Sequence, residues 1–167
     1  GVRDTATGHI HPLKFLVGLG KAAAKAGAAI HEKTKATAID SAGGKVRITT
    51  PRGTITTDRA LIAVNAYGNG LEPESCANVM PIGSFIGATE PLPADSPVLP
   101  GGESADDSRF VVRYWRKSKD GRLLFGGREI YSPNSSGDIE AGVRRQIAEV
   151  YPALQKVKLT HAWGGYV

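Results

Sequence analysis

Four histidines and one cysteine are the first side chains to consider as metal ligands or nucleophiles, and two of the histidines, His31 and His161, are isolated in the sequence. His9 and His11 stand two residues apart, a spacing that makes a metal site only if a carboxylate or third histidine converges from elsewhere. No nearby segment supplies that ligand, so we expect both to lie at a helix entry and to bond main-chain groups. Cys76 is close to Glu72 and Glu74, whose negative charges disfavour a reactive thiolate. The sequence predicts no metal site and identifies no catalytic side chain.

Other catalytic and binding motifs are absent or weak. No serine lies in a nucleophile-elbow motif and no GxxxxGK[ST] loop is present, so hydrolases and nucleotide triphosphatases of these kinds have no support. A basic segment surrounds Tyr114 and Trp115, a composition found in nucleic-acid surfaces. Because neighbouring strand residues point to opposite faces, Arg113 and Trp115 would share one face, and Tyr114 and Arg116 the other. The charges then form no continuous stripe, and we expect no nucleic-acid partner.

Small residues gather where apolar segments end, at residues 63–68, 126–127 and 164–165. Such residues let a flat or anionic ligand approach the main chain closely. Each cluster is also ordinary turn chemistry, so these positions indicate a ligand site only in combination.

Composition limits the class of protein. The chain has 167 residues, of which 41% are hydrophobic, a single cysteine and a formal net charge of +5. One cysteine excludes an internal disulfide framework, and no segment reaches the ~20 apolar residues of a membrane-spanning helix. We expect a cytoplasmic protein with no membrane partner. The start lacks a methionine and a secretory signal, and the end lacks a polar tail, so we interpret the sequence as an interior piece of a longer chain.

The elements of the first half read as a helix followed by a meander. Pro12 begins and Gly27 ends a helical pattern, and Gly18 and Gly20 within it suggest tight packing. Short strands are expected at residues 28–32, 34–39, 45–50 and 54–57, with a hairpin turn at 43–44. The apolar run 60–64 is typical of a strand covered on both faces. This pattern predicts an α/β sheet with an inserted three-stranded layer.

The second half begins with a proline-rich loop over residues 91–107. Strands at 110–116 and 123–129 flank Asp120-Gly121, a dipeptide typical of a type I′ hairpin turn. Asp138 can cap a helix that presents Ile139, Val143, Ile147 and Val150 on one face before Pro152 ends it. A last strand is expected at 157–163.

Several phrases occur together and in a fixed order. They are HP at residues 11–12, GA at 27–28, EKTKA at 32–36, AVNAY at 63–67, TEPL at 89–92, DGRLLFGGR at 120–128 and WGG at 163–165. With them the chain resembles a central fragment of the FAD-dependent oxidoreductases of the D-amino-acid oxidase type, which include glycine, sarcosine and γ-glutamylputrescine oxidases. The resemblance spans nearly the whole chain.

The resemblance implies an α+β (mixed α/β) fold in three parts. Residues 1–77 would belong to an FAD-binding domain, 78–160 to a substrate-binding domain with a mostly antiparallel sheet, and 161–167 to a strand that returns to the FAD-binding domain. The GxGxxG fingerprint of such domains is absent here. The cofactor of the intact parent would be FAD, but this fragment should not bind it tightly, because it lacks the phosphate-binding helix N-terminus.

The resemblance also implies site residues. The adenine of FAD would lie against Ala36. Its ribose and pyrophosphate would lie against Ala63, Asn65 and Ala66, and its flavin ring would lie against Gly164 and Gly165. The substrate would be faced by Arg128, Tyr131 and Phe85.

The implied reaction removes a hydride from the carbon that bears the amine and leaves an imine. Relatives that oxidise amino acids often carry an arginine shortly after the tryptophan-glycine motif, where this chain has Tyr166 and Val167. This departure favours an amine, such as a putrescine derivative, over a simple α-amino acid, although Arg128 could hold a more distant carboxylate. The partners would be a small amine or amino acid and the rest of the parent chain. The alternative is a non-enzymatic ligand-binding or interaction domain.

Overall fold

The computed structural model describes residues 1–68, 70–131 and 138–167, apart from the side chains of Ser75 and Arg128. It divides into two compact units. One unit is formed by residues 10–80, and the other by residues 1–9 together with 81–167. Within the described residues no helix is both long and apolar enough to cross a membrane.

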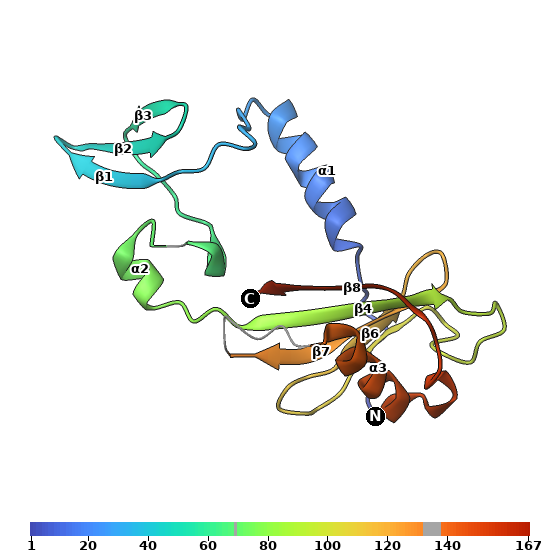
Figure 1. Cartoon of the computed structure of the whole chain (residues 1–167). Helices are drawn as coiled ribbons and strands as arrows, with labels where there is room; N and C mark the ends of the chain where they lie inside the picture. Colours follow the sequence, from blue (N-terminus) through green and yellow to red (C-terminus); the bar gives the residue numbers. More distant parts are fainter. Residues whose placement is uncertain (69, 132–137) are drawn as a thin grey trace. The chain divides into compact units, whose positions relative to one another are not determined.

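The unit of residues 10–80 begins with helix α1 (Pro12–Lys25), followed by the predicted three-stranded meander (Figure 1). Strands β1 (Ala38–Ala42), β2 (Lys45–Thr50) and β3 (Gly53–Thr57) pair antiparallel. The register aligns Ile39, Ile48 and Ile55 in one cross-strand row. Gly43 and Gly44 both have positive φ, +60° and +73°, the backbone that a type I′ turn requires.

Two strands expected in this unit do not form. Residues 28–32 are turn and irregular backbone, and so are residues 60–64. Leu61 is 92% exposed, whereas a strand covered on both faces needs paired neighbours that no described segment supplies. The chain continues through the 3₁₀ turn η1 (Asn65–Tyr67) and the short helix α2 (Pro73–Ala77).

Helix α1 has no buried residue. Its large apolar side chains are exposed on more than one side of the helix: Leu13, Phe15, Leu16, Val17 and Leu19. No atom lies within 4 Å of a β-carbon built at Gly18 or Gly20. The tight packing expected at these glycines is therefore not present in the described structure.

The second unit is built on a five-stranded sheet in the order β5-β6-β7-β4-β8 (Figure 1). Its strands are β4 (Gly83–Pro91), β5 (Ser104–Asp106), β6 (Tyr114–Lys117), β7 (Arg122–Ile130) and β8 (Leu159–Tyr166). Every described pairing is antiparallel, which confirms the mixed α/β fold with an antiparallel sheet. Strand β5 lies within the segment that the sequence predicts to be only loop, and β4 lies where no strand was predicted.

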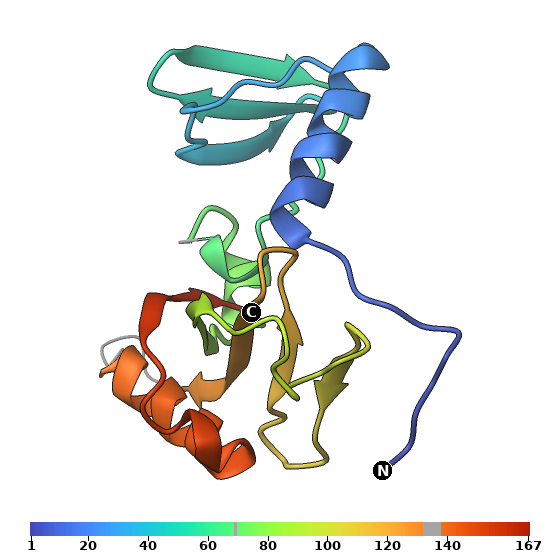
Figure 2. The same ribbon diagram turned by 90° about the vertical axis from the view of Figure 1, so that its right-hand side faces the viewer.

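Helix α3 (Ile139–Val150) packs on one face of this sheet, against β4, β7 and β8 (Figure 2). Asp138 caps it as predicted, because its Oδ1 accepts the Ala141 N–H at 2.9 Å. Pro152 ends the helix and begins the 3₁₀ turn η2 (Pro152–Leu154).

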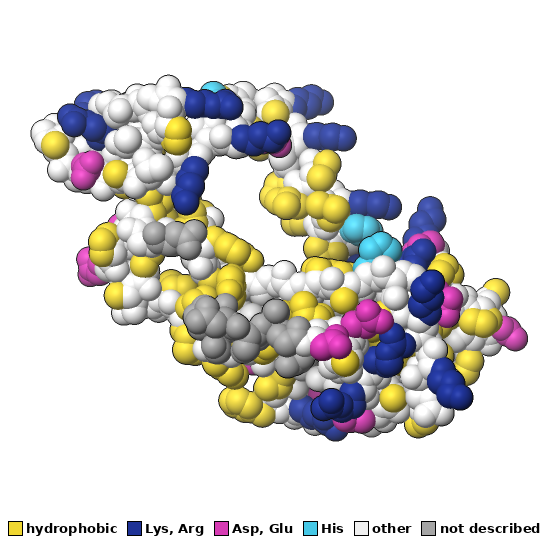
Figure 3. Space-filling view, viewed as in Figure 1, with side chains coloured by type: hydrophobic (Ala, Val, Ile, Leu, Met, Phe, Trp, Pro, Cys, Tyr) yellow, Lys and Arg dark blue, Asp and Glu magenta, His cyan; other side chains and the backbone are white. Residues whose placement is uncertain are grey.

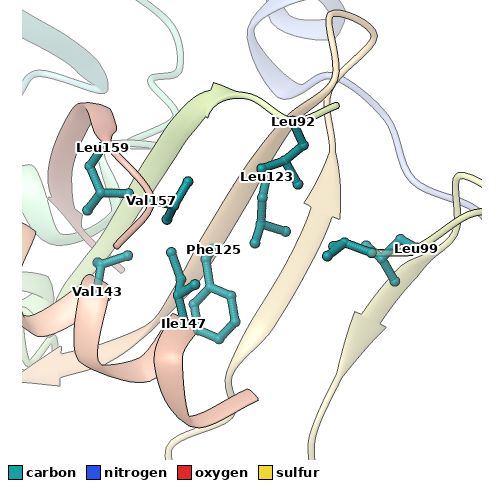
Figure 4. Close-up of a cluster of buried hydrophobic side chains, with 9 residues drawn as sticks. Leu92, Leu99, Leu123, Phe125, Val143, Ile147, Val157 and Leu159 are labelled. Atoms are coloured by element: carbon teal, nitrogen blue, oxygen red, sulfur yellow. The ribbon is translucent and has the colours of Figure 1, made fainter. Parts of the chain in front are cut away.

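The core lies between α3 and the sheet (Figure 4). Val143 and Ile147 of α3 are fully buried with Leu123 and Phe125 of β7. A β-carbon at Gly87 of β4 would be 2.8 Å from Val143, so the helix rests directly on the strand there. Among the residues that the structure describes in this unit, no helix covers the other face of the sheet.

The hairpin between β6 and β7 forms, but its turn differs from the prediction. Only Gly121 has positive φ, +82°, and Asp120 does not, so the loop is not a type I′ turn. The loop runs from Ser118 to Gly121, and the Ser118 side chain accepts the Arg122 N–H at 3.1 Å. This side-chain bond stabilises a longer turn.

Candidate functional site

Five residues form one row across the sheet on the face opposite α3. The register pairs Trp163 of β8 with Ile86 of β4, and Ile86 with Gly126 of β7. It then pairs Gly126 with Tyr114 of β6, and Tyr114 with Asp106 of β5. Residues paired directly in an antiparallel sheet point to the same face. Trp115 lies on the opposite face, where it stacks on Phe125 with ring centroids 5.2 Å apart. We call the face that carries the row the open face.

Tyr114 lies across Gly126. A β-carbon at Gly126 would be 2.5 Å from the Tyr114 ring, so only glycine leaves space for the ring at this position. The Tyr114 hydroxyl reaches Ser84 of β4, where the two oxygens are 3.1 Å apart. Tyr114 remains 39% exposed. Its ring and hydroxyl are thus held in a defined place on the open face.

A second row of the open face carries basic groups. Ala88 of β4 pairs with His161 of β8 and with Leu124 of β7, and Leu124 pairs with Arg116 of β6. Arg116 stands two residues beyond Tyr114 and His161 two residues before Trp163. The basic row therefore lies beside the aromatic row, about 6.7 Å along the strands.

Phe85 and Gly164, two residues predicted for the site, are in contact. They are register partners in β4 and β8, and Phe85 is only 7% exposed. A β-carbon at Gly164 would be 2.4 Å from the Phe85 ring. Phe85 thus supports the strand from the side of the sheet that bears α3, and it has little surface to offer a ligand.

The other two residues predicted to face the substrate lie at the end of β7. Arg128 is the register partner of Phe85, and its side chain lies outside the described part of the structure. Tyr131 follows the strand, is 53% exposed and donates its hydroxyl to Glu129 Oε2 at 2.9 Å. This hydrogen bond to a carboxylate is the main cause that raises the pKa of Tyr131 above its usual value.

The residues predicted to hold the nucleotide portion of FAD lie in the other unit. Ala36 precedes β1, and Ala63, Asn65 and Ala66 lie in the segment around η1. Asn65 has φ of +47°, a left-handed conformation that asparagine tolerates better than most residues. Ala63 and Asn65 are exposed.

An ionic cluster holds the approach to β6 against α3. The buried Arg113 side chain donates to Asp107 Oδ2 at 2.5 Å and to Glu149 Oε2 at 3.1 Å. Hydrogen bonds from Arg113, first from its main-chain N–H and then from its side chain, hold the pKa of Asp107 below its usual range against the effect of burial. The charge of Arg113 is therefore paired within this cluster, and we assign the residue a structural role.

Two cavities of about 450 and 290 Å³ lie beside α3 and share Arg109 and Gln146 in their linings. No site residue predicted from the sequence lines either of them. Figure 3 shows acidic and basic side chains interspersed on the surface of this unit. Neither cavity has the apolar lining typical of a cofactor site.

The histidines near the start of the chain behave as expected at a helix entry. His11 caps α1, with its Nδ1 accepting the Lys14 N–H at 3.4 Å, and His9 Nε2 is 3.0 Å from the Gly102 carbonyl oxygen. Among the described residues no group of three or more potential ligands could hold a metal ion.

Comparison with known proteins gives the class of this chain. Residues 1–167 all match the model of the family described as FAD dependent oxidoreductase. The chain therefore belongs to the FAD-dependent oxidoreductase family.

Two curated relatives illustrate the range of the family. The chain is 62% identical over 167 residues to a "Probable oxidoreductase OrdL" of Rhizobium meliloti, covering all of this chain and 39% of that protein. It is 32% identical to the γ-glutamylputrescine oxidoreductase of Escherichia coli, covering 97% of this chain and 38% of that protein. The chain thus spans about two fifths of the length of these relatives.

Solved structures show the same fold at low sequence identity. L-proline dehydrogenase from P. horikoshii superposes with a TM-score of 0.68 at 18% identity, covering 93% of this chain and 43% of that one. Glycine oxidase from Geobacillus kaustophilus also gives 0.68, at 21% identity, covering 90% and 40%.

Two of the positions predicted for the nucleotide, Ala63 and Asn65, are exposed, so the rest of their unit does not cover them. Gly164 is also exposed, although Phe85 occupies the space where its side chain would be. The GxGxxG loop that binds the pyrophosphate at a helix N-terminus is absent from this sequence.

Sequence reasoning missed Ser84, Tyr114 and Trp163 as candidates. Strand alternation did place Tyr114 and Arg116 on one face, which was the available signal. The glycine beneath the Tyr114 ring comes from another strand, so a pattern within one strand could not indicate it.

Proposed function

We propose that the protein containing this chain oxidises an amine or an amino acid to an imine. Residues 1–77 contribute to its FAD-binding domain, residues 78–160 to its substrate-binding domain, and residues 161–167 to a strand that returns to the FAD-binding domain. The observation that carries the proposal is the family match over all 167 residues. The names of three similar proteins, a γ-glutamylputrescine oxidoreductase, an L-proline dehydrogenase and a glycine oxidase, support the substrate class.

The reaction needs few catalytic side chains. The carbon next to the nitrogen loses a hydride, the nitrogen loses a proton, and water hydrolyses the resulting imine. When bound, FAD accepts the hydride and later passes the electrons to oxygen or another acceptor. The protein has to orient the amine and exclude competing reactions, which agrees with a sequence that shows no triad or carboxylate pair.

The residues of this chain would divide the work between cofactor and substrate. Ala36 and the main chain of Ala63, Asn65 and Ala66 would lie along the nucleotide, and Gly164 and Gly165 near the flavin ring. Arg128 and Tyr131 would hold the polar end of the substrate, with Phe85 fixing the strand between them and Gly164.

The test is a substrate screen on the full-length protein with FAD bound. Amines and amino acids are mixed with the enzyme without oxygen, and loss of the flavin absorbance is followed, with peroxide release measured in air. We expect bleaching by at least one amine or amino acid. A protein that binds FAD but is bleached by none of them would contradict the proposal and favour the non-enzymatic alternative.

A further inference from the structure

The open face of the sheet combines two features that suit different ends of one small molecule. The aromatic row presents Trp163 and Tyr114 on either side of Ile86 and Gly126. Of the five side chains of this row only Asp106, the register partner of Tyr114, carries a charge. The basic row beside it presents Arg116 and His161.

We propose, resting on the oxidase function above, that the open face binds an alkylamine that carries a carboxylate at its far end. The aromatic row binds the alkyl chain and its ammonium group, and Arg116 in the basic row pairs with the carboxylate, a role that the proposed function gave to Arg128. Tyr114, Trp163 and Arg116 are then the residues that determine substrate choice.

The aromatic row fits an alkylamine for three reasons. Aromatic faces attract ammonium groups and also pack against methylene groups. Tyr114 and Trp163 are both exposed, at 39% and 44%, although large aromatic side chains usually bury more of their surface. The Tyr114 hydroxyl is held 3.1 Å from the Ser84 hydroxyl, so the ring is positioned before a ligand arrives.

The glycine at position 126 makes this arrangement possible. The Tyr114 ring occupies the space that any side chain at Gly126 would need, with a distance of 2.5 Å to a built β-carbon. The ring therefore lies over β7 and toward β4, so that it narrows the distance to Trp163. A bare sheet at this row would separate the two Cα atoms by about 14 Å, or three strand spacings.

The basic row fits a carboxylate at a fixed distance. Arg116 is partly buried on the open face, and the guanidinium fork suits both oxygens of a carboxylate. The two rows are about 6.7 Å apart along the strands, a separation that an extended chain of four or five carbons spans. Two acidic residues lie near the aromatic end by register, Asp106 opposite Tyr114 and Glu129 opposite Ser84. Their negative charges favour an ammonium group at that end.

The test compares three probes on the full-length enzyme with FAD bound: 5-aminopentanoate, pentylamine and alanine. KM and kcat are measured for each, and binding is measured by calorimetry without oxygen. We expect 5-aminopentanoate to have a KM about tenfold below that of pentylamine, since a hydrogen bond to a charged group is of this strength. Alanine is expected to be the poorest of the three.

Variants assign the effect to residues. Arg116→Gln should remove the tenfold preference by raising the KM for 5-aminopentanoate. Tyr114→Phe, which keeps the ring, and Trp163→Leu should raise KM for both amines about three- to tenfold, with kcat, flavin content and melting temperature unchanged. Phe110→Leu and Arg145→Gln change an exposed aromatic and an exposed cation outside both rows, and they should change nothing.

The possible failures are distinguishable. If no amine bleaches the flavin, the proposed function fails. Independently of that result, the present inference is overturned if Arg116→Gln leaves the binding of 5-aminopentanoate unaffected. If amines are oxidised but the three variants keep wild-type KM values, the function stands and the open face is not the substrate site. Loss of flavin or of stability in Tyr114→Phe and Trp163→Leu alike would show a structural role and would also overturn the inference.

Discussion

The Phe85 ring lies so close to Gly164 that a β-carbon there would be 2.4 Å from it. The two residues are cross-strand partners in β4 and β8. A larger side chain at either position would therefore clash with the other residue unless that residue moved or became smaller.

Gly164→Ala should destabilise the unit of residues 81–167 by about 1–3 kcal/mol through overpacking. Adding Phe85→Leu should recover part of that loss, which a double-mutant cycle in urea would measure as coupling. Both tryptophans lie in this unit, so their fluorescence reports its unfolding. Gly101→Ala is the control, because its β-carbon would meet only the flexible end of Glu103. Additive effects of the two substitutions would contradict the contact.

Thr89 replaces a missing ladder bond between β4 and β7. Its buried Oγ1 accepts the Leu123 N–H at 3.0 Å where the register shifts. Thr89→Val keeps the shape but leaves that N–H unsatisfied, so we expect a loss of about 1–3 kcal/mol in urea unfolding. Thr89→Ser keeps the hydroxyl and should lose less. A larger loss in the serine variant would show that the methyl group, and not the hydrogen bond, is what matters.

The ionic cluster at Asp107 predicts a stability that falls in acid. Its pKa is lowered in the folded state, so the folded state binds fewer protons than the unfolded state. The contribution is fully present above the unfolded pKa of about 4 and is lost as the pH falls through the lower folded pKa. Asp107→Asn should be less stable than wild type at pH 7, and the difference should shrink below pH 4. Denaturation curves at several pH values test this, and a constant difference would contradict it.

Alanine substitutions at Gly18 and Gly20 should have opposite effects on stability in the 167-residue chain and in the full-length protein. In the 167-residue chain nothing lies near either position, so alanine should raise helix content and stabilise α1 by about 1 kcal/mol per site. If the exposed apolar residues of α1 are covered in the full-length protein, the same alanines should destabilise it. Circular dichroism and thermal melts of both forms measure the signs. Stabilisation in both forms would show that α1 has no close partner.

The 167-residue chain purified alone should be colourless. It lacks the GxGxxG loop, and the helix N-terminus after such a loop supplies much of the affinity for the pyrophosphate. Absorbance in the flavin band after dialysis against FAD measures the bound fraction. A stoichiometric yellow protein would mean that residues 36 and 63–66 hold the cofactor without that loop.

Local signals in the sequence predicted the elements that depend on local chemistry. The Asp138 cap, the glycine pair at 43–44 and the helix start at Pro12 each act within a few residues, and the structure confirms them. The type of the hairpin turn was wrong because a side chain, Ser118, stabilises a longer loop.

Elements that depend on distant partners were harder to predict. Strand β4 lies beside β7 and β8, but its small residues Gly83 and Gly87 give no clear alternation. The run at residues 60–64 has the composition of a buried strand and no described partner to pair with. The position of Tyr114 over Gly126 likewise joins two strands, so only the three-dimensional structure could show it.

Gly127 adds one residue to β7, since Ile86 pairs with Gly126 but Phe85 pairs with Arg128. Its φ of +140° accommodates that extra residue. Before Gly127 the odd-numbered residues of β7 lie on the same face of the sheet as Phe125. After Gly127 the even-numbered residues lie on that face. A mutant library that varies every second residue of β7, counted from Leu123, would therefore change to the wrong face of the sheet beyond Gly127. A relative that has one glycine where this chain has Gly126 and Gly127 would need an alignment gap inside the strand.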